Sequence, residues 1–269
     1  MKPSALGRFR HDVMRGLRLG DYLERPGDGR VRPQIAACDL LWSLLIGQVL
    51  REGSHHAIEA LVHSSARRAL GVAQPFGDDA LGYFTERLAV EPMRAALAAV
   101  VRRAKRNKAF ENSRWIGLAL DGTGAGGSAA CHCALCHPIT NADGAVIGHG
   151  HHLSLISVVG TGLTLPCDVE PYGPGDSELR ASERLFDRTV EALGQRFADY
   201  VVVDGAYANA PFLHRVRAHG LHVVARLKDN LPTLPALRSF PPRVLRTYPP
   251  CLPQRDVVNV AQDSLGCPA

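Results

Sequence analysis

Two aspartates, each at the end of an apolar run, are the residues of this sequence best placed to do chemistry. Asp121 follows the run W-I-G-L-A-L at 115–120, and Asp204 follows Y-V-V-V at 200–203. Each run predicts a buried strand, and a glycine follows each aspartate, so we expect both carboxylates where a strand gives way to a turn. On neighbouring strands they would offer the oxygen ligands that Mg²⁺ or Mn²⁺ prefers, at a site suited to phosphoryl displacement. Taken singly, each aspartate is also explained as the cap of its own turn.

A cysteine-rich segment, C-H-C-A-L-C-H, is the second candidate site. Its residues Cys133 and Cys136 have the spacing of a zinc knuckle. A closed Zn²⁺ site needs two further ligands, which His149 and His151 could supply from one face of a strand, while His152 points to the other face. The alternative is a flexible loop with reduced thiols.

The elements that must position these residues begin after residue 113. Three strands are followed by alternating helices and strands, and this order, βββαβαβ, predicts an α/β fold with a mixed sheet that has an antiparallel edge. The predicted elements are strands 116–120, 151–159 and 163–169, helix 176–194, strand 200–203, helix 210–219 and strand 221–227.

The first part of the chain predicts helices instead. Residues 33–112 indicate a small helical bundle, and its last helix ends in a basic cluster that complements the helix dipole or contacts DNA phosphates. Residues 1–32 predict a basic flexible tail, with an arm on DNA as the alternative. Residues 232–269 predict a proline-rich irregular tail. The basic cluster consists of Arg102, Arg103, Lys105, Arg106 and Lys108.

The composition is that of a globular protein, with 46% hydrophobic residues, 21% charged residues and a formal charge of +5. Most of the basic residues are arginines, which suit bidentate phosphate contacts and favour a polyanionic partner such as DNA. The sequence shows no signal peptide and no membrane-spanning apolar segment, which predicts a cytoplasmic protein with seven reduced cysteines.

The order of the motifs resembles the catalytic domain of bacterial insertion-sequence transposases of the DDE type. The resemblance covers residues 114–231. It implies an RNase H-like fold, Asp121 and Asp204 as the first two metal-binding acids, and metal-dependent DNA cleavage followed by strand transfer. The matching segments are D-G-T from Asp121, H-H-L at 151–153, G-D-S-E at 175–178, V-D-G-A-Y-A-N at 203–209 and R-L-K-D-N at 226–230.

The resemblance also implies roles for four side chains near these acids. Tyr207, Asn209, Arg226 and Lys228 match family positions that shape the site or contact DNA. Their ordinary interpretations are core packing for Tyr207, a helix cap for Asn209 and solvated charge for the two cations. Transposases usually act as dimers, so the expected partners are DNA and a second copy of the chain.

The sequence departs from the family at the third acid, which is a glutamate on a helix after the last core strand. No glutamate occurs after Glu191, and the three aspartates beyond Asp204 lie in no predicted helix. Glu178 precedes Asp204, and its position at a helix N-terminus explains its charge without chemistry. The sequence therefore predicts a truncated or frame-shifted transposase that is slow or inactive. The alternative is a non-catalytic DNA-binding fragment that acts as a regulator.

Two other enzyme classes fit less well. A haloacid-dehalogenase-like phosphatase also has a strand ending in D-x-D-G-T, but here Ala119 occupies the position of the nucleophilic aspartate. The glycine-rich stretch after Asp121 lacks the G-K-[ST] ending of a phosphate-binding loop.

Overall fold

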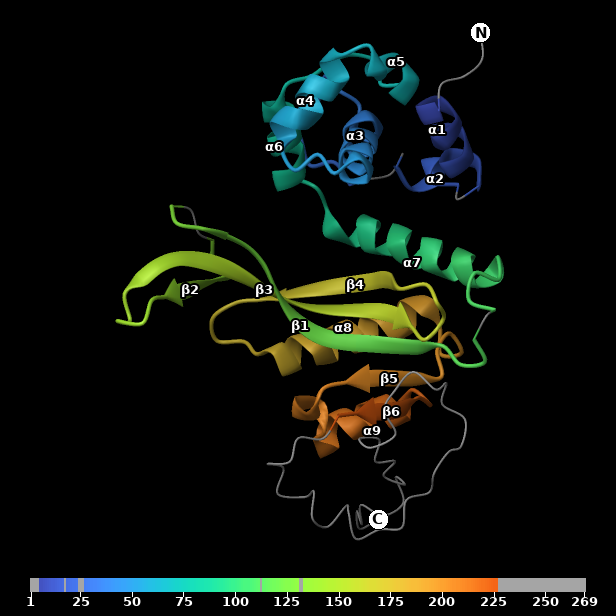
Figure 1. Ribbon diagram of the computed structural model, residues 1–269, viewed down its shortest axis with the longest axis vertical. Helices are drawn as coiled ribbons and strands as arrows, with labels where there is room; N and C mark the ends of the chain where they lie inside the picture. Colours follow the sequence, from blue (N-terminus) through green and yellow to red (C-terminus); the bar gives the residue numbers. More distant parts are fainter. Residues whose placement is uncertain (1–4, 17, 24–26, 112, 131–132, 227–269) are drawn as a thin grey trace. The chain divides into compact units, whose positions relative to one another are not determined.

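The computed structural model describes residues 5–16, 18–23, 27–111, 113–130 and 133–226 (Figure 1). The chain divides into two compact units, residues 1–103 and residues 104–269. The predicted tail at 232–269 and Lys228 lie outside the described residues. Within the described part of the chain, none of the helices has both the length and the apolar character needed to cross a membrane.

The first unit is helical, with a core built around one apolar helix. Trp42 of that helix is buried and donates from Nε1 to the carbonyl oxygen of Leu70 at 2.9 Å. Residues 55–70 form two helices, and the hydroxyl of Ser64 accepts from the amide of Ala66 at 3.1 Å at the break between them. The helices are α1 (Ala5–Gly16), α2 (Gly20–Leu23), α3 (Ala37–Leu50), α4 (His55–His63), α5 (Ala66–Leu70), α6 (Asp78–Glu86) and α7 (Val90–Arg106), which crosses the boundary between the units.

Residues 1–32 differ from the flexible tail that the sequence predicted, because α1 and α2 form there. Leu23 is buried in the core of the first unit, and Leu6, Val13 and Met14 pack against that core. The high arginine content made these spaced apolar residues hard to recognise in the sequence. Their packing against the core stabilises helices that are too short to be stable alone.

The second unit contains a mixed sheet of six strands with the order β2-β3-β1-β5-β6, and β4 pairs with β3 as well. The pairs β1–β3, β2–β3 and β3–β4 are antiparallel, while β1–β5 and β5–β6 are parallel. This is the predicted mixed α/β architecture. The strands are β1 (Gly117–Ser128), β2 (Cys136–Thr140), β3 (Val146–Val159), β4 (Leu165–Tyr172), β5 (Tyr200–Val203) and β6 (His222–Ala225).

Strand β1 is longer than predicted, and β2 is an additional strand. The sequence placed the end of the first strand at Leu120, yet β1 runs through the glycines to Ser128 because the 14-residue β3 pairs with it all along this stretch. A bulge between Ala125 and Gly127 absorbs one residue, and Gly126 adopts a positive φ of 61° there. Asp121 therefore lies inside β1 rather than at its end.

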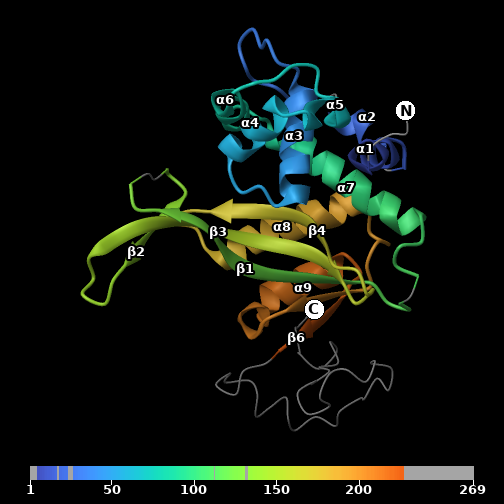
Figure 2. The ribbon, with the colours of Figure 1, turned by 45° about the horizontal axis from the view of Figure 1, so that its top comes forward.

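Helix α8 (Glu178–Leu193) packs against β1, β3 and β4, and ion pairs fix it to β4 (Figure 2). The hydroxyl of Ser177 caps its first turn by accepting from the amide of Arg180 at 3.3 Å. Arg188 donates to the buried Asp168 at 2.7 Å and to Glu170 at 2.8 Å. The ion pairs of Arg188 hold α8 in place relative to β4.

Helix α9 (Ala210–Ala218) connects β5 to β6 and packs on α8. Asn209 caps it, since its side-chain oxygen accepts from the amide of Phe212 at 3.1 Å, as the ordinary interpretation of this residue predicted. The rings of Phe186 and Phe212 lie 6.0 Å apart between the two helices, and Arg215 pairs with Asp187 beside them.

Asp199 joins the starts of the three parallel strands. Its side chain accepts from the amide of Ile116 at 2.8 Å, its own amide donates to the Ile116 carbonyl at 2.8 Å, and its carbonyl accepts from the amide of His222 at 3.1 Å. Asp199 thereby bonds to the residue before β1 and to the first residue of β6, and it directly precedes β5. These bonds set the register of the three strands relative to one another.

We expect Asp199→Ala to lower the free energy of unfolding by about 1–3 kcal/mol, because the half-buried amide of Ile116 loses its acceptor. Chemical denaturation followed by circular dichroism measures this change. Asp143→Ala, which removes an exposed carboxylate in the turn between β2 and β3, is the control and should change the stability by less than about 0.5 kcal/mol. Equal effects of the two substitutions would contradict the role given to Asp199.

Candidate active site at the ends of three parallel strands

The registers of the parallel strands align two acids and one base in a row. Ala119 of β1 pairs with Val202 of β5, so two residues further along the same register aligns Asp121 with Asp204. Val203 pairs with Ala225 of β6, so one residue further aligns Asp204 with Arg226. The paired residues of β1 and β5 end at Ala119 and Val202, so the alignment of Asp121 with Asp204 continues that register by two residues, at the point where β5 ends.

Both aspartates also serve their local backbone. Asp121 is exposed, and its Oδ1 accepts from the amide of Gly122 at 2.9 Å. Asp204 is half-buried, and its Oδ1 accepts from the amide of Ala206 at 2.8 Å as the cap of the short 3₁₀ helix Gly205–Tyr207. Asp204 therefore has the turn-capping role that the sequence allowed, whereas Asp121 accepts from its own backbone within β1 and caps no turn.

Glu178 is the residue at this end of the sheet whose position the sequence did not reveal. It lies in the first turn of α8, and its carboxylate rests directly against Gly122, so that a Cβ at residue 122 would overlap it. A third carboxylate thus lies beside the residue that follows Asp121. The absence of a side chain at Gly122 is what makes room for it.

A buried chain of hydroxyl groups holds the Glu178 carboxylate. The hydroxyl of Tyr207 donates to Glu178 Oε1 at 2.8 Å and lies 2.8 Å from the Ser182 hydroxyl, which lies 2.5 Å from that of Ser154. Tyr207 is 1% exposed, and both serines are fully buried. Tyr207 therefore packs in the core, as its ordinary interpretation predicted, and it also orients an acid at the candidate site.

The electrostatics of the two nearby tyrosines follow from their burial and from the acids around them. Burial raises the pKa of Tyr207, and the hydrogen bond to Glu178 and the negative charges of Glu178 and Asp121 raise it further, against a hydrogen bond from Ser182 that lowers it. Burial, with the charge of Glu178 and a hydrogen bond to it, also raises the pKa of Tyr172. Both phenols stay protonated and can donate, as a hydrogen bond to a carboxylate requires.

The donor set at this end of the sheet fits a hard divalent cation. Asp121, Asp204 and Glu178 offer only carboxylate oxygens, which are ligands of Mg²⁺ and Mn²⁺. Their ligand atoms do not all lie within 4.8 Å of one another, so the three do not form one closed ligand group. Mg²⁺ usually keeps several of its waters and binds through one or two carboxylates, which suits an arrangement of this width.

The cysteine segment forms a tighter group than the carboxylates. The ligand atoms of Cys133, Cys136 and His151 all lie within 4.8 Å of one another. His149, two residues along β3, does not belong to this group, and the ring of His152 stacks on that of His137 with centroids 4.4 Å apart. Of the two histidines that the sequence proposed as ligands, the structure brings one to the cysteines.

The predicted DNA-contacting cations have different environments. Arg102 and Arg106 of α7 are exposed, and Arg103 is half-buried. Lys105 instead donates to the carbonyl oxygens of Arg196 and Phe197, at 2.8 and 2.6 Å, and burial lowers its pKa. Lys105 thus anchors the loop between α8 and β5, and that role is independent of DNA.

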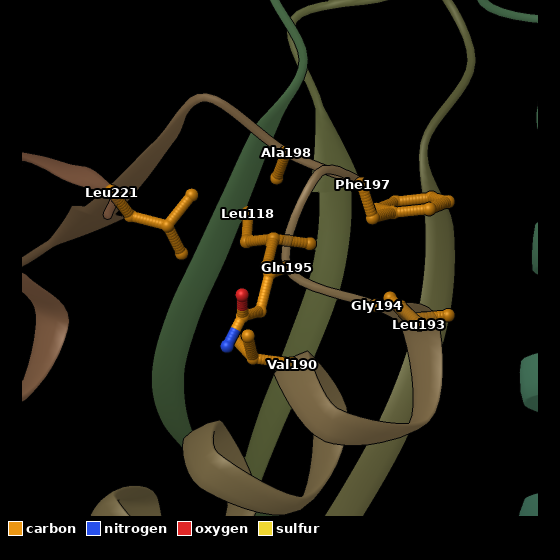
Figure 3. Close-up of a pocket in the computed structure, with 8 residues that line it drawn as sticks. All are labelled: Leu118, Val190, Leu193, Gly194, Gln195, Phe197, Ala198 and Leu221. Atoms are coloured by element: carbon orange, nitrogen blue, oxygen red, sulfur yellow. The ribbon is translucent and has the colours of Figure 1, made fainter. Parts of the chain in front are cut away.

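A small apolar pocket lies away from the carboxylates, at the C-terminal end of α8 (Figure 3). The side chains that line it leave no room for even a water molecule, so it is part of the packed hydrophobic core rather than a ligand site. It is lined by Leu118, Val190, Leu193, Gly194, Gln195, Phe197, Ala198 and Leu221.

Comparison with known proteins adds little to this geometry. No protein-family model matches the chain, and no curated protein matches it. One similar solved structure is the piggyBac transposase synaptic complex with hairpin DNA, at 12% sequence identity and a TM-score of 0.40. The match covers 87% of this chain and 54% of that one, so this chain spans about half the length of the protein it matches. At this level of similarity, conclusions about the site rest on its own geometry.

We expect Tyr207→Phe to lower the free energy of unfolding by about 1–3 kcal/mol, since it removes a buried hydroxyl that contacts both Glu178 and Ser182. Thermal or urea denaturation measures the loss. Tyr83→Phe is the control and should be near neutral, because the hydroxyl it removes from α6 makes only a long, solvent-exposed hydrogen bond of 3.4 Å with the amide of Val31. A neutral Tyr207→Phe would contradict the hydrogen-bonded chain described for this site.

Proposed function

We propose that this chain is a transposase of the DDE type, which cleaves and joins DNA strands with a divalent metal ion held by Asp121 and Asp204. The observation that supports this most directly is the parallel register that aligns the two aspartates. The strand order β4-β3-β1-β5-β6, antiparallel on one side of β1 and parallel on the other, supports the RNase H-like fold that the sequence resemblance implies.

Glu178 is the third carboxylate in this proposal. The family places its third acid on a helix after the last core strand, whereas here the glutamate comes from the helix before β5. Its support is geometric: the carboxylate lies against Gly122, and Tyr207 holds one of its oxygens. Its place before Asp204 in the sequence is compatible with this role, because α8 packs on β1 with its first residue against Gly122.

Each side chain has a separate task in this reaction. Asp121 and Asp204 supply the metal ligands, and Glu178 adds negative charge that attracts the cation to this end of the sheet. A divalent ion bound there stabilises the charge that develops on the phosphate and lowers the pKa of a bound water or hydroxyl. Arg226, aligned with Asp204 and exposed, is placed to bind a DNA phosphate and offset the charge of the acids.

A second candidate function is a DNA-binding protein of the same lineage that does no chemistry. The observation that favours it is that both aspartates already accept backbone hydrogen bonds, Asp121 from the amide of Gly122 within β1 and Asp204 from the amide of Ala206. In that case the sheet is a scaffold, and the exposed arginines of α7 are the functional surface. DNA binding that persists without strand cleavage distinguishes this alternative from the enzyme.

We expect the protein to nick supercoiled plasmid DNA that carries the sequences flanking its gene, in Mn²⁺ or Mg²⁺ but not in EDTA. Asp121→Asn and Asp204→Asn should each reduce nicking by at least about 100-fold, because each removes a charged metal ligand. Gel electrophoresis of the open-circular product gives the rate, and Asp143→Asn is the exposed control. Nicking that is equal in all four proteins would contradict the proposal.

Glu178 is tested by a pair of glycine substitutions in β1. Gly122→Ala should displace the Glu178 carboxylate, because the three atoms nearest to its Cβ belong to the carboxyl end of that side chain, and should lower the stability by no more than Tyr207→Phe does. We expect a fall of about 10-fold or more in nicking and weaker Mn²⁺ binding by calorimetry. Gly124→Ala is the matched control, since a Cβ there meets nothing within 4 Å.

Glu178→Gln should reproduce the effect of Gly122→Ala, whereas Glu191→Gln, on the exposed C-terminal part of the same helix, should not. If Asp121→Asn abolishes nicking while Gly122→Ala and Glu178→Gln leave the rate and the Mn²⁺ affinity unchanged, the two aspartates act without Glu178.

A further inference from the structure

The Cys133, Cys136 and His151 side chains converge at the start of β2 with the spacing of metal ligands. The two sulfur atoms lie 3.8 Å apart, and His151 Nε2 lies 3.2 Å from Cys133 Sγ and 3.4 Å from Cys136 Sγ. Two sulfurs on a tetrahedral Zn²⁺ lie about 3.8 Å apart, and a sulfur and a nitrogen about 3.6 Å apart, given Zn–S and Zn–N bonds of about 2.3 and 2.1 Å. A shift of a few tenths of an ångström in His151 suffices to match these separations.

The backbone around the cysteines is already folded as a metal-binding turn. The amide of Cys136 donates to the Cys133 carbonyl at 3.1 Å, which closes the turn. The amide of Leu135 donates to Cys133 Sγ, and the amide of Cys133 donates to Cys136 Sγ, both at 3.4 Å. Amide donors to sulfur favour the thiolate form, which is the form that binds metals.

The strands supply the third ligand from a distant part of the sequence. Cys136 and His151 are directly paired across β2 and β3, so the register itself brings the imidazole to the thiol. His149 lies about 6.7 Å further along β3, which explains why it misses the group.

We propose that Cys133, Cys136 and His151 bind one Zn²⁺, which fastens the segment ahead of β2 to the middle of β3. Cys133 is exposed, so the fourth coordination position is open to solvent. Oxygen-preferring Mg²⁺ is excluded by the two sulfur ligands. This proposal is independent of the chemistry at Asp121.

The proposed zinc site is placed to stabilise the β2–β3 hairpin of the second unit. In both ribbon views the β2–β3 hairpin extends beyond β4 and α8 (Figures 1 and 2). The proposed site lies at the base of this hairpin, because Cys136 begins β2 and pairs with His151 of β3. The turn that carries the cysteines packs on Gly173, where a Cβ would lie 3.0 Å from Leu135 Cα and 3.1 Å from the Ala134 carbonyl oxygen. Gly173 leads from β4 towards the start of α8, so the zinc also braces the segment that ends at Glu178.

The rival interpretation of a Cys-x-x-Cys pair is a redox-active dithiol. At 3.8 Å the sulfurs are far from the about 2.05 Å of a disulfide bond. Metal content and thiol oxidation therefore separate the two interpretations.

The test is the metal content of the full chain, purified without chelators under reducing conditions. Mass spectrometry of the metals should find about one Zn²⁺ per chain. Exchange with Co²⁺ should give the sulfur-to-cobalt charge-transfer absorption in the near ultraviolet and the visible bands of tetrahedral cobalt. Cys133→Ser, Cys136→Ser and His151→Asn should each lose most of the bound metal, whereas Cys38→Ser, a half-buried thiol of α3, should keep it.

A measurement on the unaltered protein guards against variants that fail to fold. Iodoacetamide should modify Cys133 and Cys136 slowly in the zinc-loaded protein and at least about 10-fold faster after removal of zinc by a chelator, as peptide mass spectrometry can quantify. A reduced protein that holds no zinc after incubation with Zn²⁺, or alkylation that is unchanged by the chelator, would overturn the proposal. So would formation of a Cys133–Cys136 disulfide in protein that binds no metal.

Discussion

The register of three parallel strands is the constraint on which the candidate active site depends. Asp199 sets this register at the start of the strands through its bonds to Ile116 and His222. Since alternate residues of a strand face opposite sides, a slip of one residue would turn Asp121 away from Asp204. The acids are thus aligned by a carboxylate at the opposite end of the same strands.

Three carboxylates at one end of a sheet repel one another unless the surroundings offset their charge. Glu178 gains from its place in the first turn of α8, where the helix dipole favours negative charge, and from the donated hydrogen bond of Tyr207. Arg226 adds a positive charge in line with Asp204. A bound divalent cation would neutralise the negative charge that remains on the carboxylates. The proposed site is thus preorganised for the cation.

The two metal sites proposed for this chain differ in a way that follows from their ligands. The carboxylates lie on β1, after β5 and in the first turn of α8. They offer only oxygen ligands, and their ligand atoms do not form one close group. The thiols and the imidazole lie in a tight group whose separations match one ion. The first arrangement suits a metal that exchanges waters and contacts a substrate, whereas the second suits a metal that stays in place and holds structure.

The sequence predicted the strands and helices of the second unit well where the apolar pattern was strong. The run at 200–203 and the helix after Ser177 are present almost as expected. The length of β1 could not be predicted, because the glycines after Asp121 have weak strand preference and are held only by pairing with β3. The helices α1 and α2 were not predicted, because the frequent arginines of residues 5–23 made the few apolar residues that pack on the core hard to recognise.

Glu178 shows why chain order alone is a poor guide to an active site. Its position before Asp204 in the sequence argues against it as the third acid. A helix that packs across the sheet can nevertheless place its residues near any of the strands. Two signals were available in the sequence: an acid one residue after a helix cap, and a glycine directly after Asp121 with room for a neighbouring side chain. Neither signal says which end of the sheet the helix begins at, and that information comes only from the packing of α8.

Iron-directed cleavage of the polypeptide tests the central claim most directly. Fe²⁺ that occupies a Mg²⁺ site produces hydroxyl radicals there with ascorbate and peroxide, and these cut the nearby backbone. The account predicts cuts close to residues 121, 178 and 204, all suppressed by excess Mg²⁺ and all lost together in Asp121→Asn. Cuts that avoid these three segments, or that persist unchanged in Asp121→Asn, would contradict a shared metal site at the ends of β1 and β5.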